Sequence, residues 1–351
     1  MYPAMRKLRA FIVDEYLPRA PADGALSTYP EGVQAYEFLV RLRTTTSLDA
    51  RAIHALGQRE VARLRGEMEG QMRASGFNGS FPEFIAFLHE DPRFFLPDAE
   101  AMLARYRDIA KRVDPLLPQL FAELPRAPYG VRSIPAHQGT DKMDNYDAPS
   151  LDGTRAGWFN ANTSALRRRP IWGMETLFAH EAVPGHHLQI ARALELPGMP
   201  KFRRGLFYTA YVEGWALYAE TLGDRLGLFT EPYSRFGHLQ WQAFRAARLV
   251  VDTGIHSQGW TRGEAIDWMT ERTGFARETV VAEVDRYYVW PAQALGYMIG
   301  ALKIAELRDR AKAALGERFD IRRFHMAVLD TGAVPLGVLE QQIDDWIAEN
   351  K

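Results

Sequence analysis

The chain has 351 residues, of which 47% are hydrophobic and 25% are charged, as in an ordinary globular protein with a large core. It carries 43 Lys and Arg against 44 Asp and Glu, so its charge gives no sign of a nucleic-acid or anionic-membrane partner. The absence of cysteine excludes disulfides, thiol catalysis and cysteine metal ligands. Any bound metal must therefore rest on His, Asp and Glu.

Two features bear on where the protein works. No apolar run approaches the ~20 residues that a membrane-spanning helix needs. The first residues, MYPAMRKLRAFIVDEYLP, have charges scattered through the stretch where a signal peptide would have its apolar core. We therefore expect a soluble, cytoplasmic protein with neither membrane nor nucleic acid as partner.

The first third of the chain has the pattern of amphipathic helices, with apolar residues three and four apart and charges on the opposite face. Three segments show it: 33–43, 50–74 and 98–124. Pro115 and Pro118 should interrupt the last of these helices, because proline cannot donate the helical hydrogen bond. We take residues 1–125 as an N-terminal helical region.

The composition changes between Pro125 and Arg169, where Pro, Gly, Asn, Asp and Thr become frequent. Within this stretch, Tyr129–Ile134 and Ala156–Thr163 have the pattern of short strands. Helical patterns then continue to the end, over about 170–192, 205–223, 231–255, 262–273, 278–286, 291–315 and 338–349. The sequence predicts a mainly α fold with a small sheet, in which residues 126–351 form a second region of one continuous domain.

The segment HEAVPGHHLQI, from His180 to Ile190, differs from the zinc-binding helical pattern H-E-x-x-H. The next histidines are His186 and His187, six and seven residues after His180. On a regular helix, residues six apart point about 120° away from each other, and residues seven apart lie ~10.5 Å apart along the axis. Zinc–nitrogen bonds are only ~2.0–2.1 Å long. A regular helix therefore cannot bring either histidine to the same ion as His180.

Pro184 and Gly185 allow another geometry, because proline breaks the helix and glycine tolerates the backbone of a bulge. If two residues loop out, His186 takes the place of the second ligand. If three loop out, His187 does. Alternatively, Pro-Gly simply ends the helix, and the two histidines are polar residues that open the next one.

A candidate third ligand is Glu213, which lies 27 residues after His186 in the apolar segment AYVEGWALYAETLG. A carboxylate among such neighbours is costly to bury unless it is paired or binds a metal. Glu220, two turns further along, could support a ligand or could be a solvated charge. The alternative for Glu213 is a buried salt bridge to one of three arginines: Arg203, Arg204 or Arg286.

Five segments together resemble one bacterial family: PSLDGTRAGWFNANT, HEAVPGHHLQI, YVEGWALYAE, RLVVDTGIHSQGW and RYYVWPAQALGYMIG. From about Tyr2 to Asp344 the chain is similar to the domain of unknown function 885. The resemblance implies a gluzincin-type zinc metallopeptidase with a large helical, zincin-like fold and the small sheet beside the active-site helix. Members of the family usually carry a further helical segment ahead of this region. Without that segment, we expect the cleft either to be open or to be completed by a second subunit of a homo-oligomer.

The resemblance also implies roles in hydrolysis. It implies one zinc ion per chain, held by His180, Glu213 and His186, with His187 as the alternative second ligand. Such an ion leaves one position for water and lowers the pKa of that water toward ~7. Glu181 would act as the general base.

Four further side chains are candidates for the same site. His256 and Tyr297 would donate hydrogen bonds to the oxyanion, as a His and a Tyr do in related peptidases. The alternatives are a helix-end histidine bonded to a carbonyl and a core aromatic residue. Asn160, in the strand-like segment, could assist binding of an extended peptide, and Arg286 could receive its C-terminal carboxylate. An arginine that only pins helices together is the alternative for Arg286.

The sequence thus predicts a zinc-dependent peptidase that acts on short peptides. One alternative keeps the metal and Glu181 but has another amide or an ester as substrate. The other is a non-catalytic binding module that keeps the fold.

Overall fold

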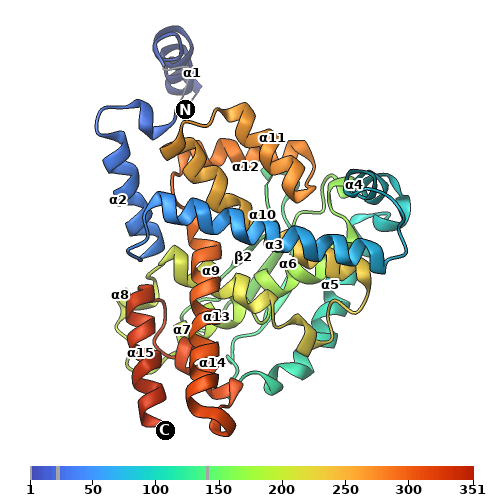
Figure 1. Ribbon diagram of the computed structural model, residues 1–351, viewed down its shortest axis with the longest axis vertical. Helices are drawn as coiled ribbons and strands as arrows, with labels where there is room; N and C mark the ends of the chain where they lie inside the picture. The colour runs from blue at the N-terminus through green and yellow to red at the C-terminus, as the bar shows by residue number, and fades with distance from the viewer. Residues whose placement is uncertain (1, 21–23, 140–141) are drawn as a thin grey trace.

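The computed structural model describes residues 2–20, 24–139 and 142–351. The protein is mainly helical, with one three-stranded sheet, as the sequence predicts (Figure 1). The strands are β1 (Tyr129–Ser133), β2 (Asn145–Asp147) and β3 (Gly157–Ala161). The helices are α1 (Tyr2–Ala10), α2 (Gly32–Thr44), α3 (Ala50–Ala74), α4 (Phe81–Glu90), α5 (Ala99–Val113), α6 (Met174–Glu181), α7 (His186–Glu195), α8 (Lys201–Arg204), α9 (Thr209–Glu220), α10 (Pro232–Gln258), α11 (Arg262–Thr273), α12 (Arg277–Val289), α13 (Leu295–Leu315), α14 (Ile321–Leu329) and α15 (Leu336–Glu349).

Helices α3 and α10 lie side by side along much of their length (Figure 1). The Asp49 side chain caps α3 by accepting a hydrogen bond from the Ala52 amide at 2.7 Å. Helix α3 buries one stripe of apolar side chains, whereas α10 is buried on almost every side from Phe236 to His256. Helix α10 is therefore a central element of the core, and polar groups on it need partners inside the protein.

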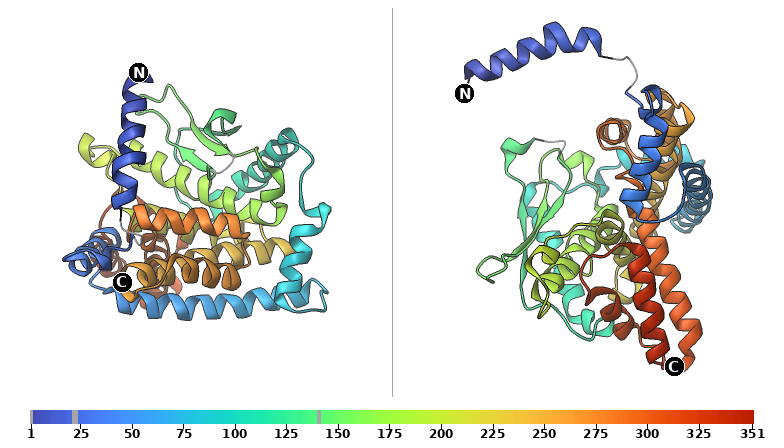
Figure 2. Two further views of the ribbon diagram at one scale, coloured as in Figure 1. Left: turned by 90° about the horizontal axis from the view of Figure 1, so that it is seen from above. Right: turned by 90° about the vertical axis from the view of Figure 1, so that its left-hand side faces the viewer.

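The sheet has the order β1-β3-β2, with β1 parallel and β2 antiparallel to β3. Val131 and Tyr146 are both register partners of Phe159 in the middle strand. Phe159 is fully buried and packs edge-on against Tyr106 of α5, with 4.8 Å between ring centroids. Both predicted strands are confirmed, and the unpredicted β2 completes a small sheet that contacts α5 and α7 (Figure 2).

Helices α9 and α13 pack with their backbones in direct contact. A Cβ atom on Gly300 would lie 1.7 Å from the Ala210 carbonyl oxygen, and one on Gly214 would lie 2.5 Å from the Gly300 Cα. Neither position can carry a side chain in this arrangement. The contact fixes the distance between Glu213 on α9 and Tyr297 on α13.

The first helix stands apart from the rest. Helix α1 and the turns that follow it project from the body, and residues 2–19 are all exposed (Figure 2). Among the described residues, no helix is both long and apolar enough to cross a membrane.

Candidate metal centre

The predicted helix over 170–192 is two helices, with a break at the unusual histidine motif. Helix α6 ends at Glu181 and α7 begins at His186, and the Val183–Pro184 peptide between them is cis. The His187 amide bonds to the Ala182 carbonyl at 3.0 Å, which closes the loop. Trp215 of α9 donates its indole N–H to the Pro184 carbonyl at 2.9 Å. The break is therefore hydrogen-bonded at both its base and its tip.

Gly185 lets this loop lie against the last turn of α6. A Cβ atom at this position would meet the His180 carbonyl oxygen at 2.0 Å and the Ala179 carbonyl oxygen at 2.4 Å. Because both are backbone atoms, only glycine fits. The close approach brings the His186 ring back beside the His180 ring, with 4.8 Å between their centroids.

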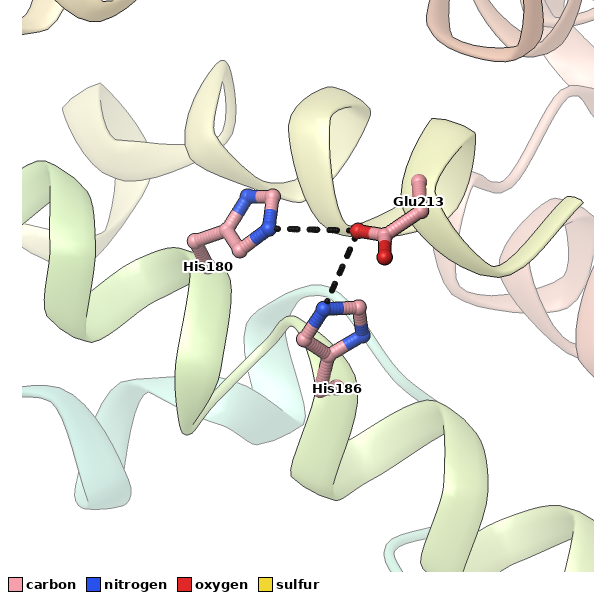
Figure 3. A group of neighbouring side chains, drawn as sticks. All are labelled: His180, His186 and Glu213. Atoms are coloured by element: carbon pink, nitrogen blue, oxygen red, sulfur yellow. Dashed lines mark ion pairs between the residues drawn. The ribbon is translucent and has the colours of Figure 1, made fainter. Parts of the chain in front are cut away.

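Three predicted ligands converge at this point (Figure 3). Glu213 Oε2 lies 3.5 Å from His180 Nε2 and 3.3 Å from His186 Nε2. Three atoms bound to one zinc ion at ~2.0–2.1 Å in tetrahedral geometry lie about 3.3 Å from one another, whereas direct N–H···O bonds are typically ~2.7–3.2 Å long. The donor set and its spacing fit a shared metal ion better than direct hydrogen bonds.

A buried carboxylate orients the first histidine. His180 Nδ1 bonds to Glu220 Oε1 at 2.7 Å, and Glu220 Oε2 accepts from the Gln242 side-chain amide at 2.8 Å. This network places the proton of the neutral ring on Nδ1 and leaves the Nε2 lone pair toward Glu213. Burial lowers the pKa of His180, but the carboxylates of Glu213 and Glu220 outweigh it and raise the pKa to about 9. A cation bound at Nε2 would replace that extra proton.

His187 points away from the three ligands and toward the sheet. Its Nδ1 atom bonds to the Tyr146 hydroxyl at 2.8 Å, and its ring packs on Tyr129 with 4.8 Å between centroids. Burial lowers its pKa to about 4, against a hydrogen bond to the Ala127 backbone. Of the two histidines that the sequence left open, the structure brings His186 to Glu213.

Glu213 does not form the salt bridge that was its alternative. Two of the candidate arginines bond to backbone carbonyls instead, Arg203 to Thr331 at 2.8 Å and Arg204 to Met199 at 3.1 Å. Arg286 pairs with Glu283. Burial raises the pKa of Glu213, but the neighbouring histidines hold it well below its usual value.

Glu181 lies beside the three ligands and near a cavity. It is buried, which raises the pKa of its carboxyl, while His186 and His180 lower it in part. Met174 and Leu177, seven and four residues earlier on the same face of α6, line a cavity of about 290 Å³. Neither Glu181 nor the three ligands are among the residues lining this cavity, so the cavity and the ligands are linked through helix α6.

Tyr297 of α13 lies next to the first histidine. Its ring is nearly parallel to that of His180, with an angle of 11° and 6.4 Å between centroids. Burial and the charge of Glu213 raise the pKa of Tyr297, and Arg248 lowers it in part. The hydroxyl therefore stays protonated and can act as a donor.

Residues 1–343 match a family described as a bacterial protein of unknown function, DUF885. The chain belongs to the DUF885 family. A comparison with curated proteins found no match.

Two solved structures resemble this DUF885 protein. The crystal structure of a "putative lipoprotein from Colwellia psychrerythraea" has 38% sequence identity and a TM-score of 0.95, over 99% of this chain and 60% of that one. The structure of a "putative lipoprotein of unknown function from Shewanella oneidensis" has 20% identity and a TM-score of 0.78, over 94% of this chain and 62% of that one. The second likeness shows the fold alone. The DUF885 chain spans less than two thirds of the length of either protein.

These relatives contradict the cytoplasmic location expected from the sequence. Both are named as lipoproteins, a class that is anchored to a membrane through a covalent lipid or exported. The expectation rested on charges within the first residues of this chain. The Colwellia psychrerythraea relative is longer, and the match covers only 60% of it.

His256 of the DUF885 protein bonds to backbone atoms, so neither ring nitrogen is free for the predicted role as an oxyanion donor. Its Nδ1 atom accepts from the Leu26 amide at 3.1 Å, and Nε2 lies 3.0 Å from the Tyr287 carbonyl. The ring is fully buried, and both nitrogens are engaged by the backbone. This is the helix-end histidine that the sequence offered as the alternative.

The two predicted substrate-binding side chains also form hydrogen bonds with other side chains of the protein. Asn160 accepts from Arg132 Nε at 2.7 Å and donates to Asn145 Oδ1 at 3.0 Å, so its side chain joins the strands of the sheet. Arg286 does line the cavity, but it bonds to Glu283 at 2.9 Å and to Gln293 at 2.6 Å.

Two buried arginines near Tyr297 were not predicted from the sequence, Arg245 and Arg248 of α10. Their guanidinium carbons lie 5.2 and 4.4 Å from the centroid of the Tyr297 ring. A signal was present in the sequence: Trp241, Arg245 and Arg248 are spaced to share one face of an otherwise mostly apolar helix.

Proposed function

We propose that this DUF885 protein is a metal-dependent hydrolase of peptide bonds, with the helical zincin-like fold of gluzincin peptidases. The observation that carries the proposal is the spacing of Glu213 Oε2 from the Nε2 atoms of His180 and His186, 3.5 and 3.3 Å. Two imidazoles and one carboxylate form a donor set that suits zinc and leaves a fourth position open.

A bound zinc ion would make water nucleophilic near neutral pH and polarise the carbonyl of the scissile bond. Glu181 would remove the proton from the attacking water and pass it to the leaving amine nitrogen. Burial raises the pKa of its carboxyl, which makes it a stronger base at neutral pH. Tyr297, stacked on His180, would donate its hydroxyl proton in a hydrogen bond to the carbonyl oxygen as negative charge develops there.

The cavity lined by Met174 and Leu177 of α6 supports short peptides as substrates. Its volume of about 290 Å³ is at the lower end of the range for small-ligand sites. Its lining combines aromatic side chains such as Trp172, Trp241 and Phe275 with charged groups. A site of this size holds a few residues and excludes a folded protein. The name of the Colwellia psychrerythraea relative supports action outside the cytoplasm.

Two measurements on the purified protein test the proposal. Elemental analysis without added metal should find one divalent ion per chain, and digestion of a short-peptide library should yield new termini. Glu181→Gln should keep the metal and the fold but show no cleavage, because the amide cannot accept the proton. A protein without metal would be the binding module, and a metal-loaded protein that cleaves only esters or other amides would be the alternative hydrolase.

A further inference from the structure

A cluster of buried charges lies beside Tyr297 and contains more cations than anions. Glu283 accepts from Arg248 at 2.8 Å, from Arg286 at 2.9 Å and from the Tyr287 hydroxyl at 3.0 Å. Burial raises the pKa of Glu283, but the two arginines outweigh it and lower the pKa to about 2. This carboxylate is thus ionised and already shared by three donors.

Arg245 has no such partner. Only 5% of it is exposed, and no carboxylate of the described residues lies within 4.0 Å of it. Its Nε and Nη1 atoms are buried without a hydrogen-bond partner, and the same is true of Nε and Nη1 of Arg248. Burying an unpaired charge is costly, so these donors indicate that an anion completes the cluster when the protein is at work.

The unused donors lie near both the cavity and the candidate metal centre. The Arg245 guanidinium carbon is 4.8 Å from the Trp241 ring centroid, and Trp241 lines the cavity. The same carbon is also 5.2 Å from the centroid of the Tyr297 ring, which stacks on His180 with 6.4 Å between centroids. An anion held by Arg245 would therefore lie within roughly three extended residues of the metal ligands.

We infer that Arg245, assisted by Arg248, binds the free C-terminal carboxylate of a short peptide substrate. A guanidinium presents parallel N–H groups that match the two oxygens of a carboxylate. A carboxylate fixed at this distance from His180 directs cleavage to one of the last peptide bonds of the substrate. The inference rests on the proposed function, to which it adds the substrate class.

The test compares peptides that differ only at the C-terminal end. One short-peptide library is prepared with free carboxylates and again with C-terminal amides, and cleavage is followed by mass spectrometry. The parent protein should cleave the acids near their C-terminal ends, with kcat/KM at least ~30-fold above that for the amides. Arg245→Gln should remove this preference by slowing only the acids. Equal rates for acids and amides in the parent would overturn the inference.

Variants separate recognition from a structural role. Arg245→Lys keeps the charge without the planar fork and should retain part of the preference. Arg235→Gln, on the same helix but in an exposed pair with Asp224, should leave the preference unchanged. Metal content equal to the parent's shows that the surroundings of His180 are intact in each variant. An Arg245→Gln protein that keeps its metal and its preference would show that Arg245 only supports the fold.

A binding readout keeps the inference separate from the proposed hydrolysis. Glu181→Gln is mixed with the acid and amide libraries, and the bound peptides are identified after rapid gel filtration. Enrichment of the peptides with free carboxylates supports carboxylate recognition, even if the parent cleaves neither library, provided that the double variant Glu181→Gln, Arg245→Gln does not show it. Cleavage that does not distinguish acids from amides would leave the peptidase proposal standing and overturn the carboxylate site.

Discussion

His180 Nδ1 bonds to Glu220 Oε1 at 2.7 Å, across 40 residues of sequence, and both side chains are almost fully buried. The contact fixes which nitrogen of the first candidate ligand is free to bind a cation. It also makes that nitrogen more basic, because the carboxylate stabilises positive charge on the ring.

Glu220→Gln should weaken metal binding by ~10–100-fold without abolishing it. The amide oxygen can still accept from Nδ1, but it carries no charge to support the ring. Competition with a chelating indicator measures the affinity. Glu100→Gln, at an exposed ion pair with Arg107, serves as the control and should bind as the parent does. An unchanged affinity in Glu220→Gln would show that the contact only supports packing.

The adjacent histidines give a matched pair of variants. His186→Ala should lose the metal, because Nε2 of His186 faces Glu213 at 3.3 Å. His187→Ala should keep it, with at most a ~10–100-fold loss of affinity, because His187 bonds to Tyr146 of the sheet. Elemental analysis measures the metal content of both variants. Metal kept in His186→Ala and lost in His187→Ala would refute the ligand assignment.

Gly185→Ala should both destabilise the fold and reduce metal content. The new Cβ would overlap the His180 carbonyl oxygen at 2.0 Å, and relief requires movement of the backbone that carries the first ligand. Overpacking of this kind costs about 1–3 kcal/mol or more. Gly66→Ala, a helical position with no heavy atom within 4 Å of the new Cβ, should be neutral or slightly stabilising. Denaturant unfolding measures the stability of both variants, and elemental analysis measures their metal content. Equal values for Gly185→Ala and Gly66→Ala would contradict the role given to Gly185.

His325 should make the protein sensitive to mild acid. Its Nδ1 atom bonds to the Leu120 carbonyl at 2.8 Å and Nε2 to the Tyr218 hydroxyl at 3.0 Å, so the native ring is neutral. Burial lowers its pKa to about 4, below the ~6.5 of the unfolded chain. Between these values the unfolded state binds the extra proton, so the stability contribution of the neutral ring is present above pH ~6.5 and lost as the pH falls toward 4.

This loss should reach roughly 3 kcal/mol for the single group. Urea unfolding at several pH values from 7 to 4 measures it. His325→Gln is expected to be less stable at pH 7 but to lose less stability on acidification. A variant with the same pH dependence as the parent would assign the acid sensitivity to other groups.

Much of the helical architecture could be predicted from periodicity alone. The bounds of α3 and α11 coincide with the predicted segments, because capping residues and amphipathic stripes are local signals. Strand β2 was missed because three residues in an Asn- and Asp-rich stretch give no periodic signal. Helix α1 was missed because its residues were weighed only as a candidate signal peptide, although they form an exposed helix.

The candidate site could be predicted only in part. His180 and Glu213 follow from residue types and spacing, but the choice between His186 and His187 depends on how Gly185 packs against α6. The partners of His256 could not be predicted for a similar reason. Its partner Leu26 lies 230 residues away in the sequence, and no local pattern reports such a contact.

The glycine contact between α9 and α13 bears on motion at the site. Most packed helices slide on a layer of side chains that can change rotamer, but Gly214 and Gly300 leave no such layer between these two. Glu213 and Tyr297 therefore travel together, as parts of one rigid pair of helices. We expect any opening of the cavity to come from its other walls, and amide hydrogen exchange should accordingly be slowest along the facing turns of α9 and α13.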